Sequence, residues 1–243
     1  MRKSIVFIPS IFFLVQLFAQ KVTTQQYKED FDYFWRTLDS NYCYWDKKKT
    51  DWNKVRLMYG SQVDSITSKA GFISLLEKAF YELYDHHASL NNNTSESQRL
   101  VPSGADLWAA YRNGKAVITE VRLGSGADNA GILAGMEVIA VNSIPVETAI
   151  QNFLPKCMRQ PDAEAKDFAL RLLLAGKHSQ DRKLTVSYQN QQRIFFPDQP
   201  RNLLESTNDK NEIESKILKG NIGYVLINNA LGNNDLIGLF DSH

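Results

Sequence analysis

The stretch VRLGSGADNAGILAGMEVIAVNSIPV, from Val121 to Val146, decides how the middle of this 243-residue chain folds. It indicates a strand, a turn of small residues, a short helix over Asn129 to Leu133, and a glycine turn. Glu137 to Val146 then carries the β-branched residues of a second strand, which ends in an asparagine and a small residue. This order of elements predicts a β-rich unit with tight turns.

Further strand signals lie on both sides of this stretch. AVITEV, Ala116 to Val121, is one β-branched run, and RKLTVSYQNQQRIFFP, Arg182 to Pro197, predicts a hairpin that turns at Gln189 to Gln191. Between them, AEAKDFALRLLLAGK, Ala163 to Lys177, predicts a helix with one apolar side and a glycine exit. We therefore expect a β-rich domain over residues 101–197 with a helical insertion.

The chain before this domain predicts helices. Thr24 can cap a helix whose aromatic and apolar residues recur every three or four positions, and Asp51 can cap a second helix. A third helix from about Gly71 carries a continuous apolar stripe. Three such stripes must bury one another, so residues 20–100 are predicted to form a small helical bundle.

The chain after the β-rich domain changes character twice. Residues 198–215 are polar and charged, which predicts a linker. Ile222 to Ile227 is apolar throughout, as in a strand buried on both faces, and Asn233-Asn234-Asp235 can open a helix. Such a strand and helix need neighbours. We expect residues 216–243 to begin an α/β core that either docks on the preceding domain or, as we favour, continues in a longer chain.

The first residues predict export. Arg2-Lys3 precedes a mostly apolar run from Ile5 to Phe18, and Ala19 then precedes polar sequence, which is the pattern of a secretory signal over residues 1–19. As a membrane anchor the run is shorter than the roughly 20 residues that a span needs, and Pro9 interrupts it. We expect cleavage after Ala19, no stable membrane span afterwards, and a location in the periplasm, the cell envelope or the extracellular space.

The composition limits the classes of binding partner that the chain is expected to have. Hydrophobic residues make up 43% and charged residues 23% of the chain, which is the balance of a soluble globular protein. The formal charge is +1, so no nucleic-acid or anionic-membrane partner is indicated. Lys47-Lys48-Lys49 is expected to be a solvated loop, and Cys43 and Cys157 are expected to be two buried free thiols.

The stretch from Val121 to Val146 resembles the central part of the PDZ domains of exported proteases. A helical bundle, this module and a strand such as NIGYVLINN, in that order, resemble the C-terminal-processing (tail-specific) serine peptidases and their tricorn-core relatives. The resemblance covers residues from about Tyr27 to Asp241. It implies an α+β multidomain fold: the helical bundle, a PDZ-like β-rich domain, and the first strand of an α/β peptidase core.

The family resemblance also implies an activity. Its members cleave peptide bonds with a serine that is activated by a lysine, or by a histidine and a glutamate in the tricorn-like branch. The nucleophile of the family lies beyond the strand represented here by Ile222 to Ile227, so the resemblance implies that this chain alone is inactive. It implies polypeptide substrates or C-terminal peptides as partners and no cofactor.

The segment LYDHHASL, Leu83 to Leu90, contains the candidate site residue. In the tricorn-like branch a histidine comes from a similar segment before the PDZ domain, and the matching position here is His87, two residues after Asp85. A partly exposed histidine at a helix exit can act as a general base. Alternatively, His87 only lines the wall between bundle and core. A metal site is not favoured, because Asp85, His86 and His87 are consecutive and point in different directions.

The β-rich domain departs from the PDZ pattern. PDZ domains add a peptide as a strand and hold its carboxylate in a glycine-containing loop. The matching place is SGADLWAAY, Ser103 to Tyr111, which lacks the alternating glycine signature, so no peptide-binding residue is assigned. Two hypotheses follow: an exported serine-type peptidase with PDZ-assisted substrate presentation, or a non-catalytic PDZ-like module of the cell envelope that binds peptides or proteins.

Overall fold

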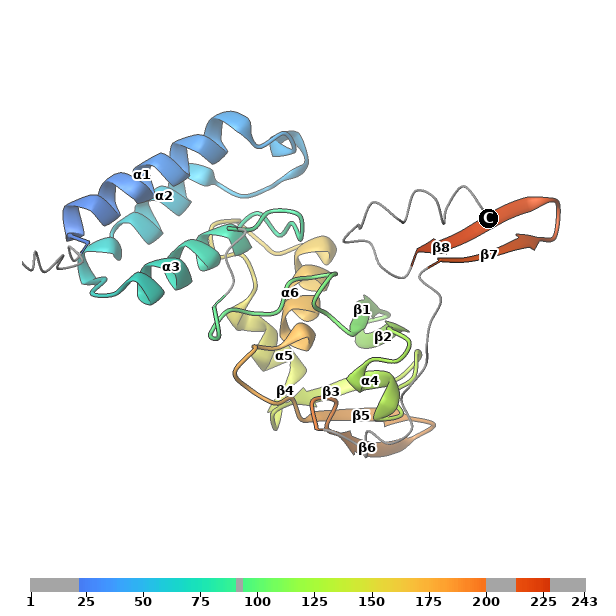
Figure 1. Ribbon diagram of the computed structural model, residues 1–243. Coiled ribbons are helices and arrows are strands. Elements are labelled where there is room, and N and C mark those ends of the chain that lie inside the picture. Colours follow the sequence, from blue (N-terminus) through green and yellow to red (C-terminus); the bar gives the residue numbers. More distant parts are fainter. Residues whose placement is uncertain (1–21, 91–93, 200–212, 228–243) are drawn as a thin grey trace, which may run out of the picture.

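The protein is described by a computed structural model that covers residues 22–90, 94–199 and 213–227. Helices α1 to α3 lie on one side of the molecule, the antiparallel sheet lies on the other, and α6 stands between them (Figure 1). The fold is therefore α+β, as predicted. The expected signal segment and the expected helix at Asn233 lie outside the described residues.

The first three helices begin at capping residues. Thr23 starts α1 (Thr24–Asn41) with a capping box to Gln26, Asp51 accepts a hydrogen bond at the start of α2 (Trp52–Gly60), and Ser68 does so for α3 (Lys69–Tyr81). Two short 3-10 helices, η1 (Trp45–Lys47) and η2 (Val63–Ser65), follow α1 and α2. The predicted Asp51 cap is confirmed, and the first cap lies one residue before the predicted Thr24.

Aromatic side chains hold these helices together. Trp35 donates its indole N–H to the Trp52 carbonyl at 2.8 Å, and Trp52 donates to the Trp35 carbonyl at 3.1 Å. The two rings are stacked with centroids 6.5 Å apart. This reciprocal pairing satisfies both buried N–H groups, so the apolar rings are buried without a polar penalty. The shared core also contains Tyr27, Phe31, Val55, Tyr59, Phe72, Leu75, Leu76, Ala79 and Leu83.

The sheet has the strand order β1-β2-β3-β5-β6, with β4 paired to β3, and every pairing is antiparallel. Its strands are β1 (Leu107–Arg112), β2 (Lys115–Val121), β3 (Glu137–Val141), β4 (Ile144–Pro145), β5 (Leu184–Tyr188) and β6 (Gln191–Phe195). The predicted hairpin is confirmed: Gln189 and Asn190 both have positive φ, 51° and 63°, as a two-residue hairpin turn requires.

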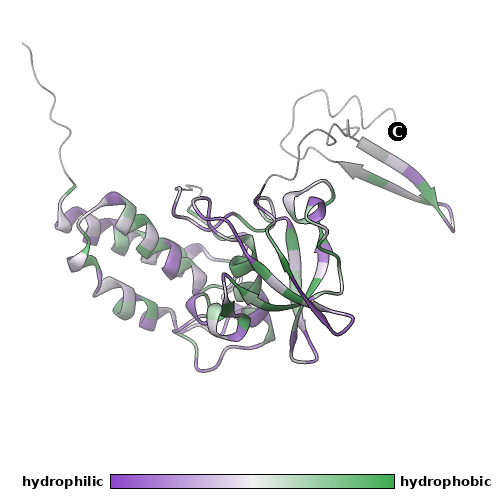
Figure 2. Cartoon of the chain, turned by 90° about the horizontal axis from the view of Figure 1, so that it is seen from below, coloured by the Kyte–Doolittle hydropathy of each residue, from purple (hydrophilic) through white to green (hydrophobic). Residues whose placement is uncertain are grey.

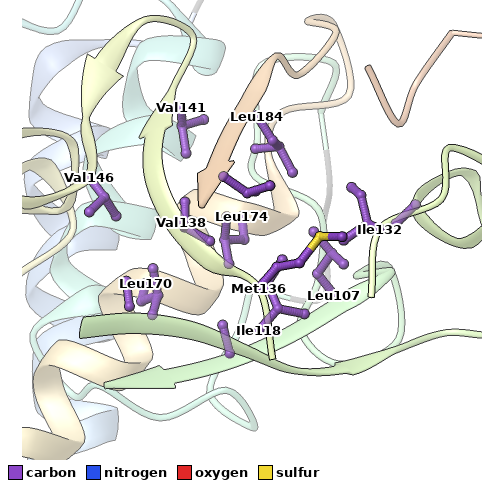
Figure 3. Packing of buried hydrophobic residues seen from close by; sticks show 14 of the residues in the cluster. Leu107, Ile118, Ile132, Met136, Val138, Val141, Val146, Leu170, Leu174 and Leu184 are labelled. Atoms are coloured by element: carbon purple, nitrogen blue, oxygen red, sulfur yellow. The ribbon is translucent and has the colours of Figure 1, made fainter. Parts of the chain in front are cut away.

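One face of the sheet is covered by helices. Short helices α4 (Gly126–Asn129), α5 (Val146–Ala149) and η3 (Ile150–Asn152) and the longer α6 (Ala163–Ala175) pack around it. Their buried side chains and those of the strands form one apolar core (Figure 3) that includes Leu107, Ile118, Ile132, Met136, Val138, Val141, Val146, Leu170, Leu174 and Leu184. In Figure 2 the hydrophobic colour runs along the strands, and the hairpin tips are hydrophilic.

Several local expectations differ from the structure. The short helix predicted over Asn129 to Leu133 lies at Gly126–Asn129, because Ser125 caps it and the positive φ of Gly131 (86°) ends the helical path. The second half of the segment Ser103 to Tyr111 is not a loop, because β1 begins at Leu107. Cys157 is buried, whereas Cys43 is exposed, so the expectation of two buried thiols holds for Cys157 only.

The last described element also differs from its prediction. β8 (Ile222–Ile227) is a strand, but it pairs antiparallel with β7 (Ile213–Leu218), so a strand begins inside the predicted linker. All described side chains from Ser215 to Val225 are exposed, Ile222 by 59%. Burial on both faces, as expected for Ile222 to Ile227, is therefore wrong for the described side chains of β8. An apolar run indicates a strand but not what covers it.

Buried charged side chains connect separate segments of the β-rich part. Arg182 is 3% exposed and donates to both oxygens of Asp106 (2.6 and 2.8 Å) and of Asp198 (2.7 and 2.8 Å). Arg99 also contacts Asp198 at 3.0 Å. These contacts raise the pKa of Arg182 in spite of its burial, so the guanidinium stays charged and links the end of α6 to β1 and to the segment after β6. None of the described helices combines the length and the apolar character of a membrane span.

Candidate functional site

A cleft of about 590 Å³ lies where η1, the segment after α3, the start of β1 and α6 meet. Its walls combine aromatic rings, two histidines and charges of both signs. The side chains that line it are those of Tyr44, Lys47, Lys48, Tyr84, Asp85, His86, His87, Pro102, Trp108, Glu164, Phe168 and Arg171. The predicted candidate His87 and its neighbour Asp85 are therefore both cleft residues.

The segment after α3 is held by a buried carboxylate. Glu82 is 1% exposed and accepts hydrogen bonds from the Tyr59 hydroxyl (2.6 Å) and the backbone N–H groups of Lys156 (2.9 Å) and Cys157 (2.8 Å). Tyr84, two residues later, has a φ of 38° and accepts a hydrogen bond from the Lys49 N–H at 2.9 Å. These contacts fix the turn from which Asp85, His86 and His87 project.

Asp85 is the polar anchor of this turn. It accepts hydrogen bonds from the Tyr42 hydroxyl (2.7 Å) and the His87 backbone N–H (2.9 Å). Burial would raise the pKa of Asp85, but these hydrogen bonds and the one to the His87 ring outweigh it, so the pKa lies below its ordinary value. Burial and the bond to Asp85 raise the pKa of Tyr42. Asp85 is thus an anion at neutral pH.

His87 projects from the rim of the cleft. Its side chain is 92% exposed, and its ring Nδ1 lies 3.3 Å from the Asp85 carboxylate. If Nδ1 carries the proton toward Asp85, Nε2 is left as an acceptor that faces away from the anchor. That arrangement suits a general base, provided that a reacting group is brought to the exposed side. The catalytic role of His87 stays a prediction.

His86 has the opposite environment. Its ring is stacked on Phe168 with centroids 4.5 Å apart and lies 5.9 Å from the Trp108 ring. Burial and the nearby positive charge of Arg171 lower the pKa of His86 to about 4, so the ring is neutral at pH 7. The structure makes His86 a wall of the cleft, and adjacent histidines carry no sequence signal that says which is buried.

Lys48 corrects the expectation of a solvated loop at Lys47-Lys48-Lys49. Its side chain is only 5% exposed, its Nζ lies 2.9 Å from Glu164 Oε1, and it sits 4.0 Å above the Tyr84 ring. Lys49 contacts Asp162 at 2.8 Å. Both acids belong to the start of α6, so this loop ties the helical part to the β-rich part. The partners lie over 100 positions away, beyond the reach of local pattern.

α6 closes the outer edge of β1 with two side chains. The Tyr111 N–H donates to Asp167 Oδ1 at 2.7 Å, and Arg171 Nε donates to the Ala109 carbonyl at 3.0 Å. The Arg171 guanidinium also stacks over the Trp108 ring at 4.0 Å. An edge strand normally offers such groups to another strand. Here a helix takes them, so an added peptide strand would have to displace Asp167 and Arg171.

The cleft has no metal-ligand set in the part of the chain that the structure describes. Among those residues, no three His, Cys, Asp or Glu side chains are close enough together to hold an ion. The chemistry that the cleft offers is therefore that of an oriented histidine, apolar and aromatic contacts, and paired charges. This combination can bind an uncharged or mixed-charge chain and can supply a proton acceptor at the rim.

Comparisons with known proteins found a family model and solved structures that are similar to this chain. Residues 23–80 match the model of the Tricorn protease C1 domain. The structure of mature CPAF complexed with lactacystin is similar, with a TM-score of 0.50 and 16% identity over 71% of this chain and 34% of that chain. A CPAF mutant structure matches with the same values. No curated protein matches.

The chain thus spans about a third of the length of the CPAF chains it matches. CPAF is a tail-specific-protease-like serine peptidase, and at this identity the likeness is one of fold. The match of residues 23–80 to the Tricorn C1 domain and this likeness in fold support the resemblance to the tricorn and tail-specific-like peptidases. The PDZ-like assignment and the domain boundaries stay predictions.

Proposed function

Starting from this relationship, we propose that the chain is the N-terminal part of an exported serine-type peptidase that hydrolyses peptide bonds in polypeptides. In this proposal the helical part and the β-rich part form a cleft that receives the substrate. The serine nucleophile belongs to an α/β core outside residues 1–243, so this chain alone is inactive. The β-rich part, as a PDZ-like domain, presents or gates the polypeptide.

The position of His87 carries the proposal. It follows the segment that matches the Tricorn C1 domain by seven residues, it stands at the rim of the 590 Å³ cleft, and Asp85 contacts its ring. An exposed imidazole whose Nδ1 is oriented by a carboxylate is what a serine nucleophile needs as its base. The His87 side chain is 92% exposed, so its ring is accessible to a reacting group.

The chemistry assigned to this chain is proton transfer. The nucleophilic serine of the core would attack the scissile carbonyl, and His87 Nε2 would take the hydroxyl proton. His87 would then pass that proton to the leaving amine, and the same ring would deprotonate the water that releases the acyl group. The Asp85 carboxylate would stabilise the ring while it is positively charged. Trp108 and Phe168 would supply apolar contacts to the bound chain.

The test begins with the intact mass and activity of the natural protein from the envelope fraction of its source. A mass well above that of residues 20–243, with casein hydrolysis that a serine reagent blocks, is expected. His87→Ala should then lower the hydrolysis rate by roughly 10²–10⁴-fold, as the loss of a general base does. His178→Ala, at an exposed histidine outside the cleft, is the matched control and should retain the rate.

Either of two results would contradict the proposal. If the natural protein hydrolyses no polypeptide, the peptidase assignment fails. If the purified 243-residue chain hydrolyses casein in a manner sensitive to a serine reagent, the placement of the nucleophile outside it fails.

A second function, peptide or protein binding without chemistry, is favoured by one observation. Every wall of the cleft is supplied by described residues of this chain, so the cleft can bind without a further domain. In this alternative the chain is a non-catalytic module of the cell envelope. It predicts a natural mass equal to that of residues 20–243 and retained peptide binding when His87 is replaced.

A further inference from the structure

A smaller cavity of about 60 Å³ lies behind the segment that carries the two histidines, between the end of α3 and α6. Asp85, His86 and Phe168 line both this cavity and the larger cleft, so the two are neighbours that share a wall. The rest of its lining is mostly apolar and includes Phe80, Leu90 and Leu172.

Two polar atoms in this cavity have no hydrogen-bond partner. They are His86 Nε2 and Gln98 Oε1, and they are the only such buried side-chain atoms among the residues that the structure describes. Both residues line the same cavity. A buried polar atom left without a partner destabilises the fold. Two unpaired atoms on residues that line the same cavity therefore point to an occupant that pairs with them.

The chemical character of each atom is set by its surroundings. The Gln98 side-chain NH₂ donates to the Leu172 carbonyl at 3.2 Å, which orients the amide and leaves Oε1 as an acceptor on the cavity side. His86 is held by its stacking on Phe168, and its ring is neutral at pH 7. Its Nε2 accepts or donates according to the tautomer. The occupant must therefore donate to Gln98 and hydrogen-bond with His86.

Charged groups at the cavity already have partners. Glu77 Oε1 accepts from the Ser97 hydroxyl, and Asp85 accepts from Tyr42 and His87. Arg99 donates to the Ala175 carbonyl and contacts Asp198, each at 3.0 Å. An anionic occupant would face the Glu77 and Asp85 carboxylates, while Arg99 is already paired, and any ion would lose its hydration, which is costly in a mostly apolar space. The occupant is thus uncharged.

The size of the cavity limits the occupant further. At roughly 10–15 Å³ for each water-sized atom, 60 Å³ holds about four to six non-hydrogen atoms. Several waters would each need two to four polar partners. Among the described side chains that line the cavity, only His86 and Gln98 have a buried polar atom without a partner. A compact group with an apolar body and one polar end satisfies both the apolar lining and the two atoms.

We propose that this cavity is a binding pocket for a small uncharged group that carries an amide or a hydroxyl. Its polar end donates to Gln98 Oε1 and hydrogen-bonds with His86 Nε2, and its body contacts Phe80, Leu90 and Leu172. This assignment rests on the proposed function in one respect: the group is identified with a polypeptide side chain of the asparagine or threonine type, next to the residue that occupies the cleft.

The direct test uses small probes on the full chain. Isobutyramide has a compact apolar body and an amide donor, and isobutyrate has the same shape but is an anion without a donor. We expect isobutyramide to shift the NMR signals of the His86 ring and the Gln98 side-chain amide in a saturable manner. Isobutyrate should bind at least tenfold more weakly.

Two variants and a control locate the binding. Gln98→Met keeps the length of the side chain but removes Oε1, and His86→Phe keeps a ring against Phe168 but removes Nε2. Each should weaken isobutyramide binding at least tenfold. Gln62→Met is the matched control, because Gln62 also donates its amide to a backbone carbonyl, that of Met58, but is exposed and far from the pocket. It should leave binding unchanged.

The outcomes separate the pocket from the peptidase proposal. If neither the His86 nor the Gln98 signals shift with isobutyramide, or if isobutyrate binds equally well, the pocket assignment is overturned and the cavity holds water only. If isobutyramide binds but peptides with asparagine or threonine do not compete with it, the pocket stands and its identification with a polypeptide side chain fails. Competition by such peptides, and not by matched alanine peptides, supports both.

Discussion

At the scale of single residues, Glu82 shows how much one buried carboxylate can organise. Its oxygens pair with Tyr59, Lys156 and Cys157, which come from α2 and from the segment before α6. In addition, the Thr50 hydroxyl donates to the Glu82 carbonyl. The side-chain oxygens therefore have hydrogen-bond donors although Glu82 is buried.

Glu82→Ala should therefore lower the free energy of unfolding by about 3 kcal/mol or more, because it leaves buried N–H groups without partners. Chemical denaturation of the full chain measures this. Glu29→Ala, at an exposed position of α1, is the control and should change stability by no more than about 0.5 kcal/mol. Equal effects of the two substitutions would show that the Glu82 contacts are not stabilising.

Two glycines with positive φ predict different costs of substitution. Gly176 (φ 70°) and Gly114 (φ 78°) both lie in the left-handed region. A Cβ at Gly176 would meet Arg182 Cδ at 2.7 Å, whereas a Cβ at Gly114 would meet nothing within 4 Å. Arg182 is held by Asp106 and Asp198 and cannot move aside without breaking ion pairs.

Gly114→Ala should thus cost about 1–2 kcal/mol from backbone strain alone. Gly176→Ala should cost about 1–3 kcal/mol more, from overpacking against Arg182. Thermal or chemical unfolding of both variants compares these losses of stability. If the two variants lost the same stability, the Gly176–Arg182 contact would be irrelevant to folding.

The buried ring of His86 predicts a pH dependence. Its pKa of about 4 in the folded chain lies below the 6.5 of the unfolded chain, so the unfolded state binds the proton more readily. Stability should therefore be complete above pH 6.5 and fall by at most about 3 kcal/mol as the pH decreases to 4. The pKa values of Asp85, Asp162 and Asp198 are lowered in the folded chain. The stability that these carboxylates contribute is therefore lost at a lower pH than that of His86.

Unfolding free energies measured between pH 7 and 4 test this expectation. His86→Phe should flatten the curve in that window. A slope that is unaffected by His86→Phe would mean that another group titrates there.

At the scale of elements, α6 serves as the neighbour of β1 in place of another strand. Asp167 and Arg171 lie four residues apart on α6 and contact groups two residues apart on β1, since one helical turn and two strand residues have similar lengths. The helix was predicted from its own apolar period. Its pairing with β1 was not, because β1 itself was not predicted as a strand.

Asp167→Ala should expose the Tyr111 N–H, and its hydrogen exchange should accelerate at least tenfold. The Ile118 N–H, which donates to the Met136 carbonyl at 2.9 Å inside the sheet, is the internal reference and should exchange as before. Asp30→Ala, at an exposed position of α1, is the control variant. Unchanged exchange at Tyr111 would show that the edge is protected by something other than Asp167.

At the scale of the whole molecule, the β7–β8 hairpin stands apart from the other described elements (Figure 1). Its described side chains from Ser215 to Val225 are exposed, and its strands pair with each other. By contrast, the helical and β-rich parts are tied together by Lys48–Glu164, Lys49–Asp162 and the contacts of Glu82.

Shortening the chain after residue 199 should consequently leave the stability of the rest nearly unchanged, within about 1 kcal/mol, because the described side chains that it removes, Ser215 to Val225, are exposed. Calorimetry of the full and shortened chains compares their unfolding temperatures. A decrease of more than about 5 °C would indicate that residues 200–243 pack on the remainder.

Much of the architecture was predictable because its signals are local. Apolar residues at every third or fourth position marked α1, α2, α3 and α6, and Asp51 marked a helix start. Turn residues at Gln189 and Asn190 marked the β5–β6 hairpin. Such patterns act through the conformation of the nearby backbone, so they can be recognised in one chain.

The sequence by itself therefore determined the order and type of most elements and pointed to the segment with Asp85 and His87. Only the tertiary structure decided that His86 is buried while His87 is exposed, that Lys48 pairs with Glu164, and that the apolar strand β8 lies exposed in a hairpin. The physical reason is distance along the chain. Burial and charge pairing depend on which remote side chains pack nearby, and no local period encodes that choice.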